Sequence, residues 1–177
     1  FDGDRQAYLS SIERQLESGI RLLQLRTQSL DGKKLKDLAQ DIRTLCQASE
    51  ATLYINEDIE LAKALDCPVH LKSRQLMQTD IESRLAGHFF SAACHTLDEL
   101  KQAEALSATY AVLGPVLATK SHPEQKGIGW PGFVKLRNEV SIPIFALGGL
   151  GVAELPVARS HGAQGVAGIS RFWPAKL

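Results

Sequence analysis

Residues 144–170 read IFALGGLGVAELPVARSHGAQGVAGIS, and this stretch holds the pattern that decides the fold. Two short apolar runs, Ile144–Leu147 and Gly165–Ile169, flank a helical segment at 152–161. Short apolar runs of this kind are typical of strands buried on both faces, as in parallel sheets. A strand, a helix and a second strand in this order predict a βαβ unit.

The same alternation extends back to the start of the chain. Further strand-like runs lie at 20–25, 52–55, 69–71, 89–93 and 110–113, and helical patterns lie at 5–18, 31–48, 58–65, 79–86, 96–106 and 130–140. Thr96, with Glu99 three positions later, predicts a capping box at the start of one of these helices. Seven strands alternating with seven helices predict one α/β domain that spans residues 1–177.

Two architectures fit this alternation, a doubly wound sheet and a (β/α)8 TIM barrel. An eight-stranded barrel typically has about 250 residues, and this chain has 177. It begins with a helix and stops just after a strand in the eighth position. We therefore expect a TIM barrel that lacks its first strand and last helix. A start at Phe1 in place of Met suggests that the sequence is part of a longer chain.

Composition excludes several classes of protein. Hydrophobic residues make up 44% and charged residues 23%, which is typical of globular domains. Twenty Lys and Arg balance twenty Asp and Glu, so a nucleic-acid-binding surface is not expected. No apolar stretch approaches the roughly 20 residues of a membrane span. Three cysteines, Cys46, Cys67 and Cys94, are odd in number and lack a Cys-x-x-Cys spacing, which predicts free thiols and a cytoplasmic protein.

Ligands of both architectures bind at the carboxyl ends of the strands. Glycines follow three of the predicted strands, at Gly114-Pro115, Gly148-Gly149 and Gly168-Ile169-Ser170. Glycine lets the backbone approach an anion closely, and free backbone N–H groups bind phosphate. The pattern is compatible with a phosphate site and equally with a simple tight turn at Gly148-Gly149.

Motifs in a fixed order connect the sequence to a known family. They are Leu23-Gln24-Leu25-Arg26, Tyr54-Ile55-Asn56, Val69-His70-Leu71, Cys94-His95-Thr96-Leu97-Asp98-Glu99, Gly114-Pro115-Val116, Ala146-Leu147-Gly148-Gly149 and Gly165-Val166-Ala167. Their order and spacing resemble thiamine phosphate synthase and the related thiazole tautomerase (TenI) group over nearly the whole chain. Residues 114–123, followed by Gly129-Trp130, resemble the thiamine-synthase-like domain fused to a MutT-type Nudix hydrolase, which implies a covalently attached Nudix domain.

The resemblance implies one set of residues for a pyrimidine substrate. Gln24 and Arg26 match the residues that bind its pyrophosphate, and Asn56 matches the residue that binds the pyrimidine. Glu57 replaces an aspartate and is a weak candidate for a magnesium ligand. Gln28 stands at the position where the family has a lysine. Residues 72–75, Lys-Ser-Arg-Gln, stand where the family has a second carboxylate that binds magnesium. Magnesium in proteins is usually held by carboxylates, so Mg²⁺ is expected only if the chain is a transferase.

The residues implied for a thiazole phosphate are better preserved. They are Gly148, Gly149, Ile169 and Ser170 for the phosphate, and Thr119 and Ser121 beside the thiazole. His95 matches the histidine that transfers a proton in the tautomerase, and a histidine can give and take a proton near neutral pH. The tautomerase branch requires no cofactor. We expect His70 and Cys94 to be buried packing residues.

Three functions remain open at this point. The main expectation is a barrel that binds a small phosphorylated thiazole and isomerises it through His95. The second is a magnesium-dependent thiamine phosphate synthase. The third is a non-catalytic ligand-binding or scaffold domain of a Nudix hydrolase of the 8-oxo-dGTP diphosphatase type. None of the three involves nucleic-acid binding by this domain or a membrane.

Overall fold

The computed structural model describes residues 4–27, 30, 32–118 and 127–173. The chain divides into two compact units. Unit 1 comprises Phe1–His70 and Arg84–Phe89, and unit 2 comprises Leu71–Ser83 and Phe90–Leu177. Each unit has its own parallel strands and its own helices packed on them.

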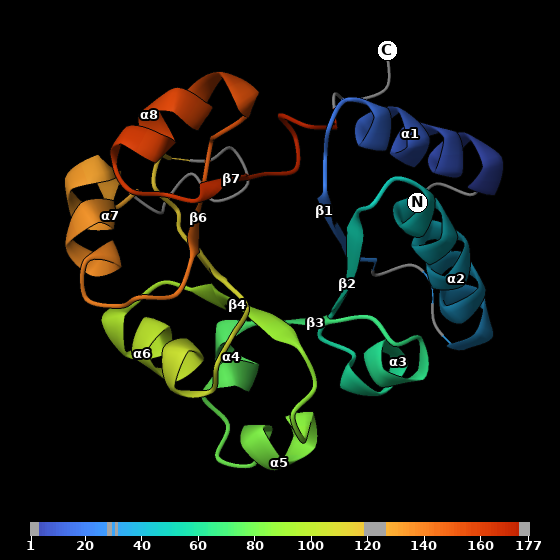
Figure 1. Cartoon of the computed structure of the whole chain (residues 1–177), viewed down its shortest axis with the longest axis horizontal. Coiled ribbons are helices and arrows are strands. Elements are labelled where there is room, and N and C mark those ends of the chain that lie inside the picture. The colour runs from blue at the N-terminus through green and yellow to red at the C-terminus, as the bar shows by residue number, and fades with distance from the viewer. Residues whose placement is uncertain (1–3, 28–29, 31, 119–126, 174–177) are drawn as a thin grey trace. The chain divides into compact units, whose positions relative to one another are not determined.

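Unit 1 alternates helices and strands in chain order (Figure 1). Its elements are α1 (Arg5–Glu17), β1 (Leu22–Leu25), α2 (Gly32–Ala48), β2 (Thr52–Asn56), α3 (Ile59–Ala64) and β3 (Val69–Leu71), whose last residue belongs to unit 2. β1 pairs in parallel with β2, and β2 pairs in parallel with β3. α2 packs against both α1 and β2.

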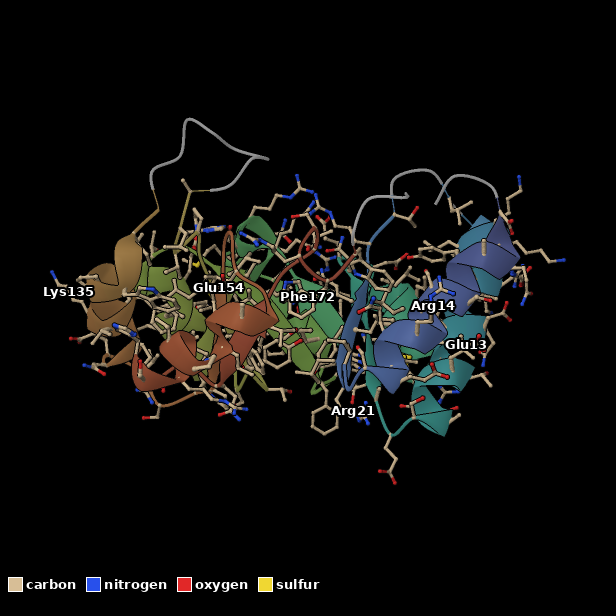
Figure 2. All side chains as sticks on the ribbon, turned by 90° about the horizontal axis from the view of Figure 1, so that it is seen from above. Glu13, Arg14, Arg21, Lys135, Glu154 and Phe172 are labelled. Atoms are coloured by element: carbon tan, nitrogen blue, oxygen red, sulfur yellow. The ribbon has the colours of Figure 1, made fainter. Side chains whose placement is uncertain are left out.

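Helix α1 shows why the local sequence folds this way. Ile12 and Leu16, four residues apart, lie on one side of the helix and are buried. Glu13 and Arg14 point away from that side and are exposed (Figure 2). Asp4 caps the helix, because its carboxylate accepts a backbone N–H of the first turn at 2.9 Å. Burial of one apolar side therefore holds the helix on its neighbours.

Unit 2 contains the remaining elements, apart from the end of α5, which belongs to unit 1. They are α4 (Ser73–Leu76), α5 (Ile81–Leu85), β4 (Phe90–Cys94), α6 (Leu97–Ala105), β5 (Ala111–Leu113), α7 (Gly129–Arg137), β6 (Ile144–Leu147), the 3-10 helix η1 (Val152–Glu154), α8 (Leu155–Ser160) and β7 (Gly165–Ala167). Each of β4, β5 and β6 pairs in parallel with the next strand in the chain. α6 packs on β4, and α8 packs on β7.

The strand order distinguishes the expected TIM barrel from a doubly wound sheet. In both units the strands pair in the order of the chain. A doubly wound sheet reverses its strand order at a switch point, whereas a barrel does not. The protein is therefore an α/β protein of the TIM-barrel type. Among the described residues, α1 precedes the first strand and no helix follows β7.

All seven predicted strands are present within two residues at either end in the part of the chain that the structure describes. The capping box of Thr96 and Glu99 is confirmed at the start of α6. Two details differ from the prediction. The short helix α4 was not expected, and the helix predicted at 152–161 is divided into η1 and α8. No helix among the described residues is long and apolar enough to cross a membrane.

The packing of two aromatic rings on the unit 2 strands requires a glycine at position 165. The rings of Tyr110 and Phe145 meet edge to face, with centroids 5.1 Å apart. Gly165 pairs with Phe145 across β6 and β7, and a Cβ atom on Gly165 would lie 2.8 Å from the Phe145 ring. Glycine at this position therefore makes room for the aromatic pair.

Candidate functional site

Polar side chains at the ends of β1 and β2 form a hydrogen-bonded chain in unit 1. Gln24 alternates with the buried Leu23 and Leu25, so its side chain lies on the opposite face of β1. Its Nε2 donates to Asn56 Oδ1 at 2.7 Å, and Asn56 Nδ2 donates to Glu57 Oε2 at 3.1 Å. The structure thus brings together three of the residues predicted for the pyrimidine side.

Arg26 and His70 differ sharply in their surroundings. Arg26 follows β1, is exposed, and forms no hydrogen bond or ion pair with the described residues. Its guanidinium is available for an anion. His70 is only 6% exposed, and this burial lowers its pKa to about 4, so the imidazole is neutral at pH 7. The expectation that His70 is buried is confirmed.

The residues present do not match a magnesium site held by two carboxylates. Glu57 is the carboxylate at the end of β2, and it already accepts a hydrogen bond from Asn56. The sequence after β3 reads Lys72, Ser73 and Arg74, so it lacks the second carboxylate that the family resemblance implies there. Among the described residues, no three His, Cys, Asp or Glu side chains gather as possible metal ligands.

His95 lies between the end of β4 and the start of α6 in unit 2, with its side chain exposed. Its Nδ1 lies 2.6 Å from the carbonyl oxygen of Gly114. A carbonyl oxygen can only accept, so Nδ1 donates and the neutral ring carries its proton there. Nε2 then has its lone pair free, and it forms no hydrogen bond with the described residues. The imidazole is arranged as a proton acceptor at Nε2.

Two glycine-containing loops after β6 and β7 leave backbone donors unused. The N–H groups of Gly149, Ile169 and Ser170 donate to no acceptor among the described residues. The loops are adjacent, because a Cβ atom on Gly168 would lie 2.8 Å from the carbonyl oxygen of Leu150. Neighbouring free N–H groups on glycine-containing backbone are a typical arrangement for binding an anion.

Close approach of the backbone accounts for Gly148. Its φ is +114°, and a Cβ atom there would lie 2.8 Å from the Cα of Pro115. The N–H of Leu117 donates to the carbonyl oxygen of Gly148 at 3.3 Å. The segment after β5 is thereby held against the loop after β6, on the same side as the carbonyl that binds His95.

Two carboxylates near these groups were not predicted as functional residues. Glu154 Oε2 accepts the N–H of Gly151 at 2.7 Å and so fixes the end of the loop after β6. Glu99 Oε2 accepts the N–H of His95 at 2.5 Å, in addition to that of Thr96 at 3.2 Å. The capping-box pattern revealed the bond to Thr96 but gave no sign of the bond to His95.

Cys94 lies directly before His95 but is fully buried. Burial, followed by the negative charge of Glu99, raises the pKa of its thiol to about 12. A thiol with such a pKa is protonated at neutral pH and is a poor nucleophile. The prediction that Cys94 is buried is confirmed, and all three cysteines are free and buried. Thr119, Ser121 and Gln28 lie outside the described residues.

Comparison with known proteins identifies the family. The family model described as thiamine monophosphate synthase (TMP-TENI) matches residues 2–172. The chain belongs to this family. The sequence resemblance to thiamine phosphate synthases is thus confirmed, and a function related to that of thiamine-phosphate synthase in thiamine biosynthesis follows from it.

Individual members of the thiamine monophosphate synthase family agree with this assignment. The chain is 33% identical over 174 residues to "Putative thiamine-phosphate synthase 2" of Aquifex aeolicus, covering 96% of this chain and 94% of the relative. It is 28% identical to the thiamine-phosphate synthase of Caldivirga maquilingensis, covering 91% and 79%. The structure of thiamine phosphate pyrophosphorylase from Pyrococcus furiosus matches with a TM-score of 0.79 and 25% identity, covering 92% and 79%.

These comparisons address the expectations unequally. They support the TIM-barrel fold and the thiamine phosphate synthase family. They do not separate the tautomerase branch from the transferase branch within that family. The expected Nudix fusion finds no support among these matches.

Proposed function

We propose that this chain binds a small phosphorylated thiazole and isomerises it by proton transfer through His95. The observation that carries the proposal is the bond between His95 Nδ1 and the Gly114 carbonyl, which leaves Nε2 free to accept a proton. A histidine with this arrangement can act as a general base near neutral pH.

The loops after β6 and β7 would bind the phosphate of this ligand. The free N–H groups of Gly149, Ile169 and Ser170 supply donors for phosphate oxygens. Thr119 and Ser121 are proposed to contact the thiazole. The glycines in these loops have no side chain, so the backbone itself can approach the ligand closely.

The proton transfer is balanced within the ligand. His95 Nε2 takes a proton from one carbon of the thiazole, and the electron pair left behind shifts the double bond. The imidazolium then returns the proton to another carbon of the same molecule. The product has the composition of the substrate, so the step needs no redox partner or leaving group. Neutral His95 is regenerated with its Nδ1 proton still directed at Gly114.

Transferase activity is the second candidate, and the hydrogen-bonded chain of Gln24, Asn56 and Glu57 favours it. This chain, together with Arg26, would bind a pyrimidine diphosphate, and the named relatives are thiamine-phosphate synthases. The cationic segment after β3 argues against the usual magnesium arrangement, so we rank this candidate below the isomerase.

Paired variants distinguish the two activities. Isomerisation of a thiazole carboxylate phosphate and magnesium-dependent coupling to a pyrimidine diphosphate are both measured for wild type, His95→Ala and Arg26→Ala. The isomerase proposal expects His95→Ala to lose isomerisation while retaining ligand affinity, and Arg26→Ala to isomerise like wild type. Coupling activity that disappears in Arg26→Ala, without any isomerisation by wild type, would establish the transferase instead. Binding without either activity would refute catalysis.

A further inference from the structure

Glu99 makes contacts that exceed those of an ordinary helix cap. In a capping box the glutamate reaches back to the N–H of the N-cap residue, which here is Thr96. Glu99 Oε2 accepts that N–H at 3.2 Å, but it also accepts the N–H of His95 at 2.5 Å. Glu99 therefore also binds a residue that lies outside the helix and before its N-cap.

His95 is consequently held at two points. Glu99 binds its backbone, and the Gly114 carbonyl, 19 residues further along the chain, binds its ring. The side chain is exposed, so packing alone does not fix its rotamer. If the backbone N–H of His95 were released, the ring would lose the position from which Nδ1 reaches Gly114.

The charge of Glu99 also acts at the end of β4. Glu99 is half-buried, and after burial itself it is the second cause of the raised pKa of Cys94, the residue next to His95. A carboxylate that close is placed to strengthen its hydrogen bond to the His95 N–H, because a charged acceptor binds more strongly than a neutral one.

We infer that Glu99 is a positioning residue, which holds His95 in the tautomer that leaves Nε2 free. This inference rests on the proposed function where it concerns catalysis, but the tautomer is a property of the chain alone. In an unconstrained histidine the neutral ring prefers its proton on Nε2. Nδ1 protonation of His95 therefore requires the bond to Gly114, and that bond requires the position set by Glu99.

Three variants test the inference. Glu99→Ala removes the acceptor, and Glu99→Gln keeps an oxygen that can accept the same N–H groups. Thr96→Ala is the matched control, because it removes the other half of the capping box, the bond from the Glu99 N–H to Thr96 Oγ1 at 3.3 Å. It leaves the Glu99 carboxylate and its bond to His95 in place.

The decisive readout is the ¹⁵N spectrum of the His95 ring at a pH where it is neutral. Wild type, Glu99→Gln and Thr96→Ala should show the proton on Nδ1, and Glu99→Ala should move it largely to Nε2. Where isomerisation is measurable, Glu99→Ala should lower kcat about 10- to 100-fold with less change in KM, as expected for a misplaced catalytic group.

Two results would overturn the inference. One is an unchanged Nδ1 tautomer in Glu99→Ala. The other is an equal effect of Glu99→Ala and Thr96→Ala on the tautomer and on kcat, which would make Glu99 a helix cap only. Absence of isomerisation in the wild type would refute the proposed function, while the ¹⁵N spectra would still decide the role of Glu99.

Discussion

Replacing Gly148 by alanine tests the close approach between the backbone at the end of β6 and Pro115. The φ of +114° at Gly148 is unfavourable for any residue with a Cβ atom, and such backbone strain costs about 1–3 kcal/mol. The added Cβ would also lie 2.8 Å from both Cα and Cβ of Pro115 and 2.9 Å from the backbone nitrogen of Val116. Forcing an atom into such a packed position costs a further 1–3 kcal/mol or so.

Gly129→Ala is the matched control in the same unit. Gly129 also has a positive φ, +65°, but the nearest atom to an added Cβ is the Cδ of Pro131 at 3.6 Å, an ordinary contact. This control therefore carries backbone strain without the clash. The free energy of unfolding of Gly148→Ala should fall about 1–3 kcal/mol further than that of Gly129→Ala.

Urea titrations followed by tryptophan fluorescence measure this difference. The two tryptophans, Trp130 and Trp173, are both in unit 2, so they report on the unit that contains both glycines. Equal unfolding midpoints for the two variants would refute the close contact between Gly148 and Pro115. A larger loss for Gly129→Ala would refute it as well.

Three further predictions concern buried and loop-fixing groups. Burial lowers the pKa of His70 to about 4, so His70 binds a proton more readily in the unfolded chain than in the folded one. As the pH is lowered from 6.5 to 4, the free energy of unfolding should therefore fall by about 3 kcal/mol. Urea titrations should show a smaller pH dependence for His70→Gln than for wild type. Glu154→Ala should free the N–H of Gly151, destabilise unit 2 by about 1–3 kcal/mol and weaken phosphate binding in calorimetry, with unchanged stability and affinity as the contrary result. A thiol reagent should label none of the three buried cysteines in the native protein at pH 7 and all three in urea, whereas rapid native labelling of Cys94 would contradict its raised pKa.

The features that the sequence predicts well are local ones. Strand positions such as Ala111–Leu113 follow from short apolar runs, because consecutive residues of a parallel strand are buried on both faces. The capping box of Thr96 and Glu99 follows from side chains three positions apart. Helix α4 was missed because its four residues, Ser73–Leu76, are too few to display a helical period.

Contacts between distant segments could not be predicted from patterns. The choice between a barrel and a doubly wound sheet depends on strand order, which no single segment encodes. The contact of Gly148 with Pro115 joins loops after different strands, so Gly148-Gly149 could equally be a tight turn from sequence alone. The resemblance to the family gave the candidates for the site, but it gave no hydrogen bond between them.

The case for a catalytic role of His95 rests on its hydrogen bonds rather than on its being a histidine. A histidine next to an N-cap residue is commonly a structural feature of the helix start, so its position in the sequence alone does not make it catalytic. What distinguishes His95 is that its backbone is bound by Glu99 and its ring by Gly114, while Nε2 is left without a partner among the described residues. Under the proposed function, this unused nitrogen is the group that would exchange a proton with the ligand.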